Sequence, residues 1–281
     1  MTGFKPPKKR PGNVEHLRLL VQSYAGQDTA IRRVQLLIST MAFVGALARV
    51  GEEDTPARFL IKGGMALELR MPGKARATKD VDAIFHGSLD ELLADLDEAF
   101  KEPYSGFSFR YTDPVEIRAT AVHRFEVKLD YEGKSWATLR VEVSPPEGGG
   151  HEPDRVPAIS LSHFLLDGPE WVACLSLRYQ IAQKLHAVSE RFDDRENDRV
   201  RDLLDLLLMR DLTDDLKPVR EACLEIFTLR DSHPWLPTIT LEPSWPAEYP
   251  RLAAELDFPV TDAEEAIAEV HAFIAAIDAA S

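Results

Sequence analysis

The stretch that decides the fold reads Lys62-Gly63-Gly64-Met65-Ala66-Leu67 and, nine residues later, Arg76-Ala77-Thr78-Lys79-Asp80-Val81-Asp82. Residues 58–61 before the two glycines, which are apolar after Arg58, predict a short strand, and residues 65–69 after them predict a short helix. Residues 81–85 predict a second strand. Residues i and i+2 of a strand face the same way, so the Asp80 and Asp82 carboxylates are expected to project from one face.

The Asp80 and Asp82 pair suggests metal chemistry. Two convergent carboxylates suit a pair of Mg²⁺ ions about 3.5–4 Å apart, which activate an attacking oxygen and steady a leaving phosphate. An isolated Asp-x-Asp is more often a polar strand end. A third carboxylate, Glu142, lies among Leu139, Val141 and Val143 but on the opposite face of that strand. It points to solvent, or it completes a three-carboxylate cluster if its strand neighbours that of Asp80.

The Lys62-Gly63-Gly64 turn is a candidate phosphate site. Glycines let phosphate oxygens approach the backbone, and the start of a helix offers N–H groups and a positive dipole end. The alternative is a plain strand-to-helix turn. Neither a Walker P-loop nor a Gly-x-Gly-x-x-Gly motif is present. Arg76 and Lys79, just before the aspartates, could neutralise a polyphosphate.

Further polar residues fall on predicted helices near the C-terminus. Lys184 lies beside an apolar helical stripe, which would bring its ammonium to the rim of the core. Asp202 and Asp205 are three residues apart on one helix face, although a solvated, salt-bridged face would look the same. His186 is expected to be a packed helix residue. The sequence has no Gly-x-Ser-x-Gly elbow, no His-Glu-x-x-His and no paired-cysteine motif, which argues against hydrolase triads and zinc sites.

Composition limits the possible functions. The 281 residues carry a net charge of −14 with 44% hydrophobic content, which indicates an ordinary globular protein and argues against a non-specific DNA coat or a binder of anionic membranes. The charge is +5 over residues 1–40, −8 over 41–210 and −11 over 211–281. Two distant cysteines, no N-terminal apolar signal and no confident membrane span predict a soluble, cytoplasmic protein.

The pattern along the chain predicts an α/β fold with a mixed β-sheet and a helical C-terminal lobe. We expect a basic, Pro-rich arm at 1–13, a core domain at 14–150 and a helical domain at 151–281 that completes the active-site cleft, with the Gly-rich loop at 145–157 near the boundary. Helices are expected at 14–24, 29–50, 65–69, 89–100, 176–192, 197–210, 216–229 and 262–280. Strands are expected at 58–61, 81–85, 107–111, 115–118, 124–131 and 135–143, and the aromatic, Pro-rich segments around Trp235 and Trp245 as crossings.

Taken together, these motifs resemble the AbiEii-type toxin nucleotidyltransferases, a branch of the polymerase-β-like superfamily. The resemblance rests on the two opening motifs and on Val141-Glu142-Val143, Gln183-Lys184-Leu185-His186 and Arg201-Asp202-Leu203-Leu204-Asp205-Leu206, and it spans roughly residues 14–280. Within that family the segments around Lys184 and His233-Pro234-Trp235 are similar to those of the MenT-like toxins. The implied fold is the polymerase-β-like nucleotidyltransferase core.

The resemblance also implies roles for individual residues. Asp80, Asp82 and Glu142 would bind two Mg²⁺ ions, and Lys184 would hold the triphosphate. Asp205 would be an essential acidic residue, either a base or a positioning group. The phosphate-side wall would be formed by Lys62, Gly63, Gly64 and Arg76. The Gly-Ser of the superfamily is Gly64-Met65 here, so a hydroxyl contact must come from elsewhere, for which Thr78 is the candidate. Thr78 is also a possible site of phosphorylation by an antitoxin.

The implied function is that of a toxin in a toxin–antitoxin system, which transfers a nucleotide from an NTP, with CTP favoured over UTP, to the 3′ acceptor end of tRNA and so blocks aminoacylation and translation. The N-terminal arm and the cations near Arg70–Lys79 could meet the RNA backbone. No membrane partner is expected. The alternatives are a nucleotidyltransferase that modifies a protein or a small molecule such as an aminoglycoside, and an inactive module that binds RNA or a partner, with Trp235 and Trp245 as a possible partner surface.

Overall fold

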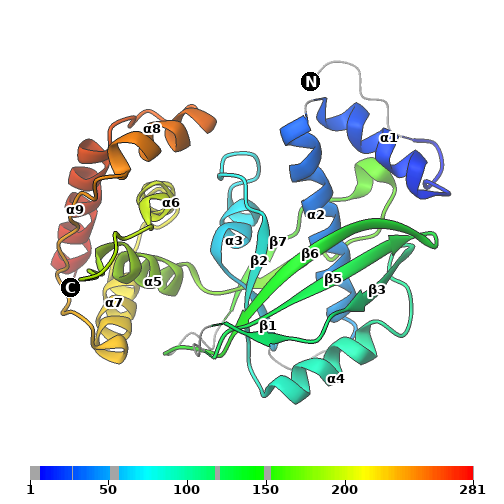
Figure 1. The fold of residues 1–281 in the computed structure, drawn as a ribbon, viewed down its shortest axis with the longest axis horizontal. Coiled ribbons are helices and arrows are strands. Elements are labelled where there is room, and N and C mark those ends of the chain that lie inside the picture. The colour runs from blue at the N-terminus through cyan, green and yellow to red at the C-terminus, as the bar shows by residue number, and fades with distance from the viewer. Residues whose placement is uncertain (1–6, 27, 51–56, 118–120, 149–152, 281) are drawn as a thin grey trace. The chain divides into compact units, whose positions relative to one another are not determined.

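The computed structural model describes residues 7–26, 28–50, 57–117, 121–148 and 153–280 (Figure 1). The chain divides into two compact units. The first comprises residues 1–70, 77–146 and 155–174, and the second comprises 71–76, 147–154 and 175–281.

A mixed sheet forms the centre of the first unit. Eight strands are present among the described residues, in the order β3-β5-β6-β2-β1-β8-β7, with β4 paired to β5. The pairs β2–β6 and β1–β8 are parallel, whereas β1–β2, β3–β5, β4–β5 and β5–β6 are antiparallel. The strands are β1 (Phe59–Ile61), β2 (Asp80–Phe85), β3 (Phe107–Tyr111), β4 (Val115–Glu116), β5 (His123–Tyr131), β6 (Lys134–Ser144), β7 (Asp154–Pro157) and β8 (Trp171–Cys174).

The hairpin of β5 and β6 follows directly from the sequence. Buried and exposed residues alternate along both strands, as expected where one face of a sheet packs on a core. Glu132 and Gly133 both have positive φ, 46° and 76°, which is the backbone of a tight two-residue hairpin turn. The residue at the end of β5, Tyr131, donates a 2.6 Å hydrogen bond to the carbonyl of Pro11, which fixes the described part of the N-terminal arm to this hairpin.

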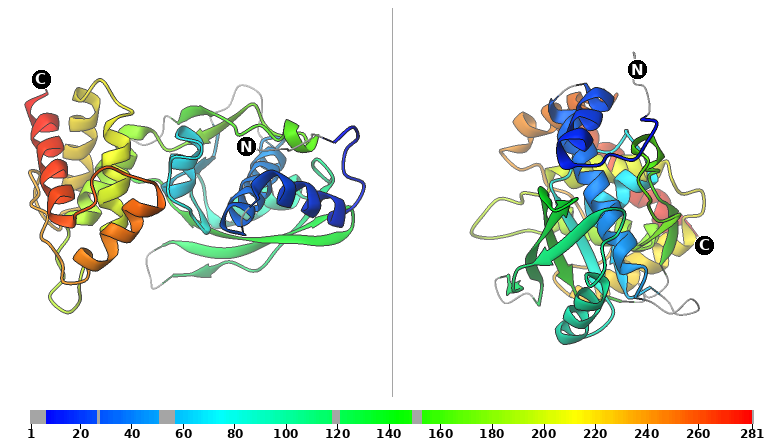
Figure 2. Two further views of the ribbon diagram at one scale, coloured as in Figure 1. Left: turned by 90° about the horizontal axis from the view of Figure 1, so that it is seen from above. Right: turned by 90° about the vertical axis from the view of Figure 1, so that its right-hand side faces the viewer.

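Helices cover one face of β3, β5 and β6 (Figures 1 and 2). They are α1 (Val14–Ala25), α2 (Asp28–Leu47) and α4 (Leu89–Ala99), and α3 (Gly63–Arg70) packs on β2. A capping box formed by Ser88 and Glu91 begins α4. One stretch of α2, Ala30–Leu47, is long and apolar enough to cross a membrane by length and composition, and half of it is buried inside the protein, as in the core helix of a globular domain.

The second unit is helical. It contains α5 (Leu177–Ser189), α6 (Val200–Arg210), α7 (Lys217–Arg230), α8 (Trp245–Glu255) and α9 (Ala263–Ala279). The expected crossing around Trp245 is in fact α8: one proline occupies the first turn, where no N–H partner is lost, and the helix also accommodates Pro250. Trp245 is fully buried and donates its indole N–H to the carbonyl of Asn197.

The boundary between the units differs from the expected division at residue 150. Residues 155–174 belong to the first unit because they include β8, which pairs with β1, and most of β7. A turn of 3₁₀ helix, Ser162–Phe164, connects these two strands. Conversely, residues 71–76 belong to the second unit although the core fold surrounds them in sequence. The chain therefore crosses between the units several times.

Candidate active site

The aspartate pair lies at the start of β2 and faces the solvent side of the sheet. Val81, between the two aspartates, is fully buried, whereas Asp80 and Asp82 are half-buried. In the parallel pairing of β2 with β6, Asp82 lies directly beside Glu142, and Asp80 lies beside Arg140. The strand of Glu142 thus neighbours that of the aspartates, which is the condition under which the sequence predicted a shared cluster.

Glu142 is already engaged by a cation. The Arg124 guanidinium donates from Nε and Nη2 to one Glu142 oxygen, at 2.8 and 2.6 Å, and Arg140 lies 3.5 Å from Asp80. Among the residues that the structure describes, no three His, Cys, Asp or Glu side chains form a set that could hold a metal ion. Asp80 and Asp82 by themselves fit Mg²⁺, because magnesium sites on nucleotide enzymes use one or two carboxylates plus substrate phosphates.

Gly63 brings the glycine turn against the aspartate pair. Its φ is +61°, and a Cβ built on it would lie 2.3 Å from Oδ2 of Asp82, so only glycine fits. The neighbouring Lys62 N–H donates to the carbonyl of Asp82 at 2.8 Å. The turn after β1 is therefore fixed both to the backbone and to the side chain of β2, next to the carboxylates. Gly64, in the first turn of α3, is buried.

The Lys62 side chain reaches across β2 to β6. Its Nζ donates to Oγ of Ser144 at 2.6 Å, and that hydroxyl lies 3.4 Å from the carbonyl of Ala83. Ser144 and Glu142 are two residues apart and share a face. The Lys62 ammonium therefore lies on the same face as Asp82 and Glu142. Sequence reasoning missed Ser144, because only the strand pairing shows that it can meet Lys62.

Thr78 lies just before the aspartates and is half-buried. Its hydroxyl donates to the carbonyl of Asp80 at 3.1 Å. This bond helps to fix the backbone at the start of β2.

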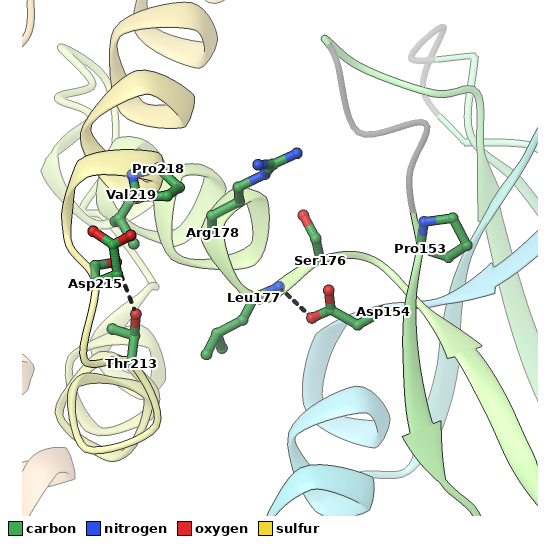
Figure 3. A pocket seen from close by; sticks show the side chains of 9 residues that line it. All are labelled: Pro153, Asp154, Ser176, Leu177, Arg178, Thr213, Asp215, Pro218 and Val219. Atoms are coloured by element: carbon green, nitrogen blue, oxygen red, sulfur yellow. Dashed lines mark hydrogen bonds between the residues drawn. The ribbon is translucent and has the colours of Figure 1, made fainter.

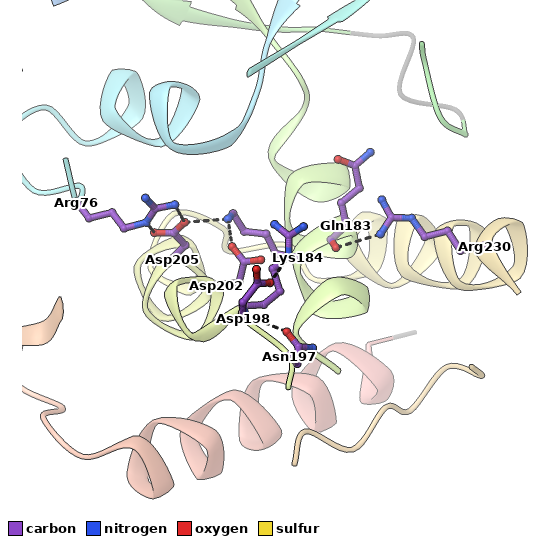
Figure 4. A network of polar contacts seen from close by, with 9 residues as sticks. Arg76, Gln183, Lys184, Asn197, Asp198, Asp202, Asp205 and Arg230 are labelled. Carbon is purple, nitrogen blue, oxygen red and sulfur yellow. Dashed lines mark hydrogen bonds and ion pairs between the residues drawn. The ribbon is translucent and has the colours of Figure 1, made fainter. Parts of the chain in front are cut away.

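A second polar cluster lies inside the helical unit (Figure 4). The Lys184 ammonium of α5 donates to the Asp202 and Asp205 carboxylates of α6, at 2.8 Å for Asp205. Arg76 donates to both oxygens of Asp205 from Nε and Nη2, each at 3.0 Å. The exposed fraction is 0% for Asp205, 6% for Asp202 and 9% for Lys184. Two cations and two anions thus share a nearly dry site.

The electrostatics of this cluster determine what Asp205 can do. Burial opposes ionisation of Asp205, but Lys184 and Arg76 outweigh it and hold the pKa of its carboxyl below the usual range. Burial likewise disfavours the charged form of Lys184, and the two aspartates outweigh it and raise the pKa of its ammonium. A general base works best with a pKa near the operating pH. The arrangement therefore favours a positioning role for Asp205 over the role of a base.

Sequence reasoning singled out Lys184, Arg76 and Asp205 but gave no role to Asp202. The i, i+3 spacing of Asp202 and Asp205 is the signal that pointed to it, since such residues share a helix face. That spacing could not show that both carboxylates turn inward to one lysine. A separate ion pair lies beside Gln183: Arg230 donates to both Glu147 oxygens, at 2.6 and 2.8 Å, and so holds the segment after β6 against α5 and α7.

The helical unit also contains a cavity of about 320 Å³. Figure 3 shows the side chains that line it: Pro153, Asp154, Ser176, Leu177, Arg178, Thr213, Asp215, Pro218 and Val219. Asp154 accepts the N–H of Leu177 at 2.9 Å, and Asp215 accepts that of Lys217 at 3.1 Å. Both carboxylates thus cap the first turns of α5 and α7, which gives them a structural role.

The mixed sheet, with an Asp-x-Asp pair on one strand packed against a Lys-Gly-Gly turn, has the polymerase-β-like fold. Residues 45–278 match the family model described as "Nucleotidyl transferase AbiEii toxin, Type IV TA system". The chain belongs to this family, as the resemblance in its motifs predicted.

The fold agrees with that of a solved structure. The chain is similar to MenT4, a nucleotidyltransferase toxin of Mycobacterium tuberculosis H37Rv, with 17% identity, a TM-score of 0.61, and 94% of this chain and 90% of that chain covered. It also matches JHP933 from Helicobacter pylori at 19% identity and a TM-score of 0.48, with 89% and 92% covered. A comparison with curated protein sequences gave no match.

Proposed function

We propose that this protein is a cytoplasmic toxin that transfers a nucleoside monophosphate from CTP or UTP, with CTP favoured, to the 3′ acceptor end of tRNA and thereby blocks aminoacylation and translation. The observation that carries the nucleotidyl transfer is the aspartate pair at the start of β2, with Gly63 packed so tightly on Asp82 that no side chain fits between them. The tRNA acceptor and the pyrimidine preference are extended from the family resemblance.

In the proposed reaction, the oxygen of a terminal ribose hydroxyl attacks the α-phosphorus of the NTP. A new phosphodiester bond forms, the bond between the α-phosphorus and the bridging oxygen breaks, pyrophosphate leaves, and the hydroxyl proton passes to solvent. Asp80 and Asp82 would hold Mg²⁺, with Glu142 as a third carboxylate once Arg124 releases it. Bound Mg²⁺ would supply polarisation of the phosphate and a lowered pKa of the attacking hydroxyl.

The glycine turn would receive the phosphates. Gly63 and Gly64 carry no side chains at the start of α3, and the Lys62 ammonium lies on the same face as Asp82. A phosphate oxygen is a stronger acceptor for the Lys62 ammonium than the Ser144 hydroxyl to which it now donates. Thr78 would supply the hydroxyl contact that the Gly64-Met65 dipeptide lacks.

We propose that the buried cluster of the helical unit serves the same nucleotide. Arg76 precedes Asp80 by four residues in the sequence. The two Asp205 oxygens hold Arg76, and Lys184 has one N–H left after its bonds to Asp202 and Asp205. Lys184 would direct this N–H at the triphosphate and balance charge on the departing pyrophosphate.

A toxin of this family implies a cognate antitoxin, and Thr78 is the proposed site of phosphorylation. A phosphate there adds about −1.5 to −2 charge two residues before Asp80, where it would repel the NTP phosphates. The modification would thus switch the enzyme off by electrostatics.

The test is transfer of label from each of four α-labelled NTPs, with Mg²⁺, to total tRNA, to polypeptide and to aminoglycosides. Label on tRNA from CTP, lost in Asp80→Ala, supports the proposal. Asp95→Ala, at a half-buried carboxylate of α4 that pairs with Arg58, serves as the matched control and should retain transfer. Label on polypeptide or on an aminoglycoside would show that the acceptor is a protein or a small molecule instead of tRNA. Equal toxicity of wild type and Asp80→Ala in cells would indicate a protein that acts by binding RNA or a partner, without catalysis.

A further inference from the structure

Ser144 lies at the end of β6, on the face of the sheet that bears the candidate metal ligands. It follows Glu142 by two residues, so the two side chains share a face. In the parallel pairing of β2 with β6, Glu142 lies beside Asp82 and Ser144 lies beside Ile84. The half-buried Ser144 hydroxyl is therefore placed just beyond the pair formed by Asp82 and Glu142.

Lys62 reaches this hydroxyl from the other side of β2. The lysine directly follows β1, and its backbone N–H donates to the carbonyl of Asp82 at 2.8 Å. Its Nζ donates to Oγ of Ser144 at 2.6 Å, on the strand that neighbours β2 at its opposite edge. The Lys62 side chain thus crosses β2 on the face that bears Asp82, and it is held at both ends.

The direction of the hydrogen bonds is fixed by their chemistry. An ammonium only donates, so the Ser144 hydroxyl accepts from Lys62. The single proton of the hydroxyl then points to the carbonyl of Ala83, which lies 3.4 Å from Oγ. Ser144 therefore connects the Lys62 ammonium to the backbone of β2, one residue after Asp82.

Ser144 is an uncharged partner for this cation. Two other cations on the same face meet carboxylates: Arg124 donates to Glu142, and Arg140 lies 3.5 Å from Asp80. A hydrogen bond between an ammonium and a carboxylate is roughly twice as strong as one to a neutral oxygen, and it would compete with a phosphate. The bond to Ser144 orients the Lys62 ammonium without neutralising it.

We propose that Ser144 is a positioning residue for nucleotide binding. Its hydroxyl holds the Lys62 ammonium next to the glycine turn, so that the phosphates of the NTP meet a cation that is already ordered. A lysine has a flexible four-carbon stem, and ordering it before the ligand arrives removes part of the cost of binding. The inference rests on the proposed function, in which Lys62 and the glycine turn receive the triphosphate.

The role predicts a graded effect of substitutions at Ser144. A hydrogen bond with a charged partner contributes about 10- to 100-fold to an equilibrium constant, and the lower figure suits a half-buried lysine that can turn to water. Ser144→Ala should therefore weaken NTP binding about tenfold. Ser144→Thr keeps the hydroxyl and should restore binding. Ser144→Asp should weaken binding more than Ser144→Ala, because its carboxylate pairs with Lys62 and repels the phosphates.

The experiment measures the Kd of a CTP analogue with a methylene bridge between the α and β phosphates, with Mg²⁺, by calorimetry on the full chain. Ser135→Ala is the matched control, since Ser135 is an exposed serine of the same strand. In the transfer assay, the KM for CTP should rise in Ser144→Ala by the same factor as the Kd, while the KM for tRNA stays constant.

A double-mutant cycle with Lys62→Ala separates positioning from a general structural role. If Ser144 acts through Lys62, then Ser144→Ala weakens binding in the wild-type background and has no further effect in the Lys62→Ala background. Independent structural contributions would instead add.

Two outcomes would overturn the inference: wild-type affinity in Ser144→Ala, or additive effects of Ser144→Ala and Lys62→Ala. Failure of the proposed function gives a different result. In that case the wild type binds the analogue and the cycle is non-additive, but no label reaches tRNA. A wild type that binds no analogue would refute both.

Discussion

Replacing Asp205 by asparagine is the sharpest perturbation of the helical unit. The change keeps the shape of the side chain and removes its charge. Asp205 is completely buried and receives two hydrogen bonds from Arg76 and one from Lys184. Without its charge, Lys184 keeps the Asp202 carboxylate as a counterion, whereas Arg76 loses its ion pair with Asp205. Removing one partner from a buried ion pair costs about 3–5 kcal/mol, because it leaves uncompensated buried charge.

This loss is large enough to measure by thermal unfolding. At about 2–4 °C per kcal/mol for a chain of this size, the melting temperature of Asp205→Asn should fall by about 10 °C. Asp211→Asn is the matched control, because Asp211 directly follows α6, is 70% exposed and lies 3.6 Å from Arg210. An exposed pair of this kind contributes about 0–1 kcal/mol. Asp202→Asn, which loses only the contact with Lys184, should fall in between.

The pH dependence has a definite sign. Since the folded pKa of Asp205 is depressed, its stabilising contribution is present above the unfolded pKa of about 3.9 and is lost as the pH falls through the folded value. The difference between wild type and Asp205→Asn should therefore shrink in strong acid. If Asp205→Asn melts within a degree of Asp211→Asn at neutral pH, the buried charge cluster does not stabilise the protein and the reasoning is wrong.

The other predictions concern separate parts of the molecule. Burial lowers the pKa of His186 to about 4, with Arg230 adding to the effect. Protonation of this ring therefore destabilises the fold as the pH falls from 6.5 toward 4. The free energy of unfolding of the wild type should decrease by about 2 kcal/mol between pH 7 and pH 5 in denaturant titrations, and that of His186→Gln by clearly less. Gly63→Ala should abolish nucleotide transfer by displacing the Asp82 carboxylate. Gly73 also has a positive φ but open space around it, so Gly73→Ala should lower the free energy of unfolding by only about 1 kcal/mol and remain active. Equal activity of the two variants would refute the packing argument. Trp245→Ala should destabilise the helical unit by about 3–5 kcal/mol in the same titrations, and a cost under 1 kcal/mol would contradict its place in the core.

Local sequence patterns predicted the strands and helices that bury one face against the core. The strands expected at 124–131 and 135–143 are present as β5 and β6, and the helix expected at 89–100 is present as α4. The condition attached to Glu142, that its strand should neighbour that of Asp80, is confirmed by the pairing of Asp82 with Glu142. That pairing joins strands some sixty residues apart, which no local pattern can determine.

Elements that depend on tertiary contacts were missed. Strand β8 has four residues and is recognisable only through its pairing with β1. Helix α8 contains two prolines, which favour a loop when read locally, but Trp245 and Tyr249 bury their rings and stabilise the helical turn nonetheless. Tertiary packing overrides propensity in such cases.

The candidate site shows the same limit. The sequence singled out Asp80, Asp82, Lys184 and Asp205 by type and spacing. It placed Asp202 beside Asp205 without a role, and Ser144 emerged only when the structure showed that it meets Lys62. Arg76 was expected on the phosphate wall, and its two hydrogen bonds to Asp205 give it a structural partner that no sequence pattern indicated.

The measurement that tests the central claim most directly compares α-labelled with γ-labelled CTP as the donor to tRNA, using wild type and Asp82→Asn. Nucleotidyl transfer predicts that label from the α position becomes attached to the RNA, that label from the γ position is released as pyrophosphate, and that Asp82→Asn loses the transfer while keeping its fold by circular dichroism. Attachment of the γ label, or undiminished transfer by a folded Asp82→Asn, would contradict the account.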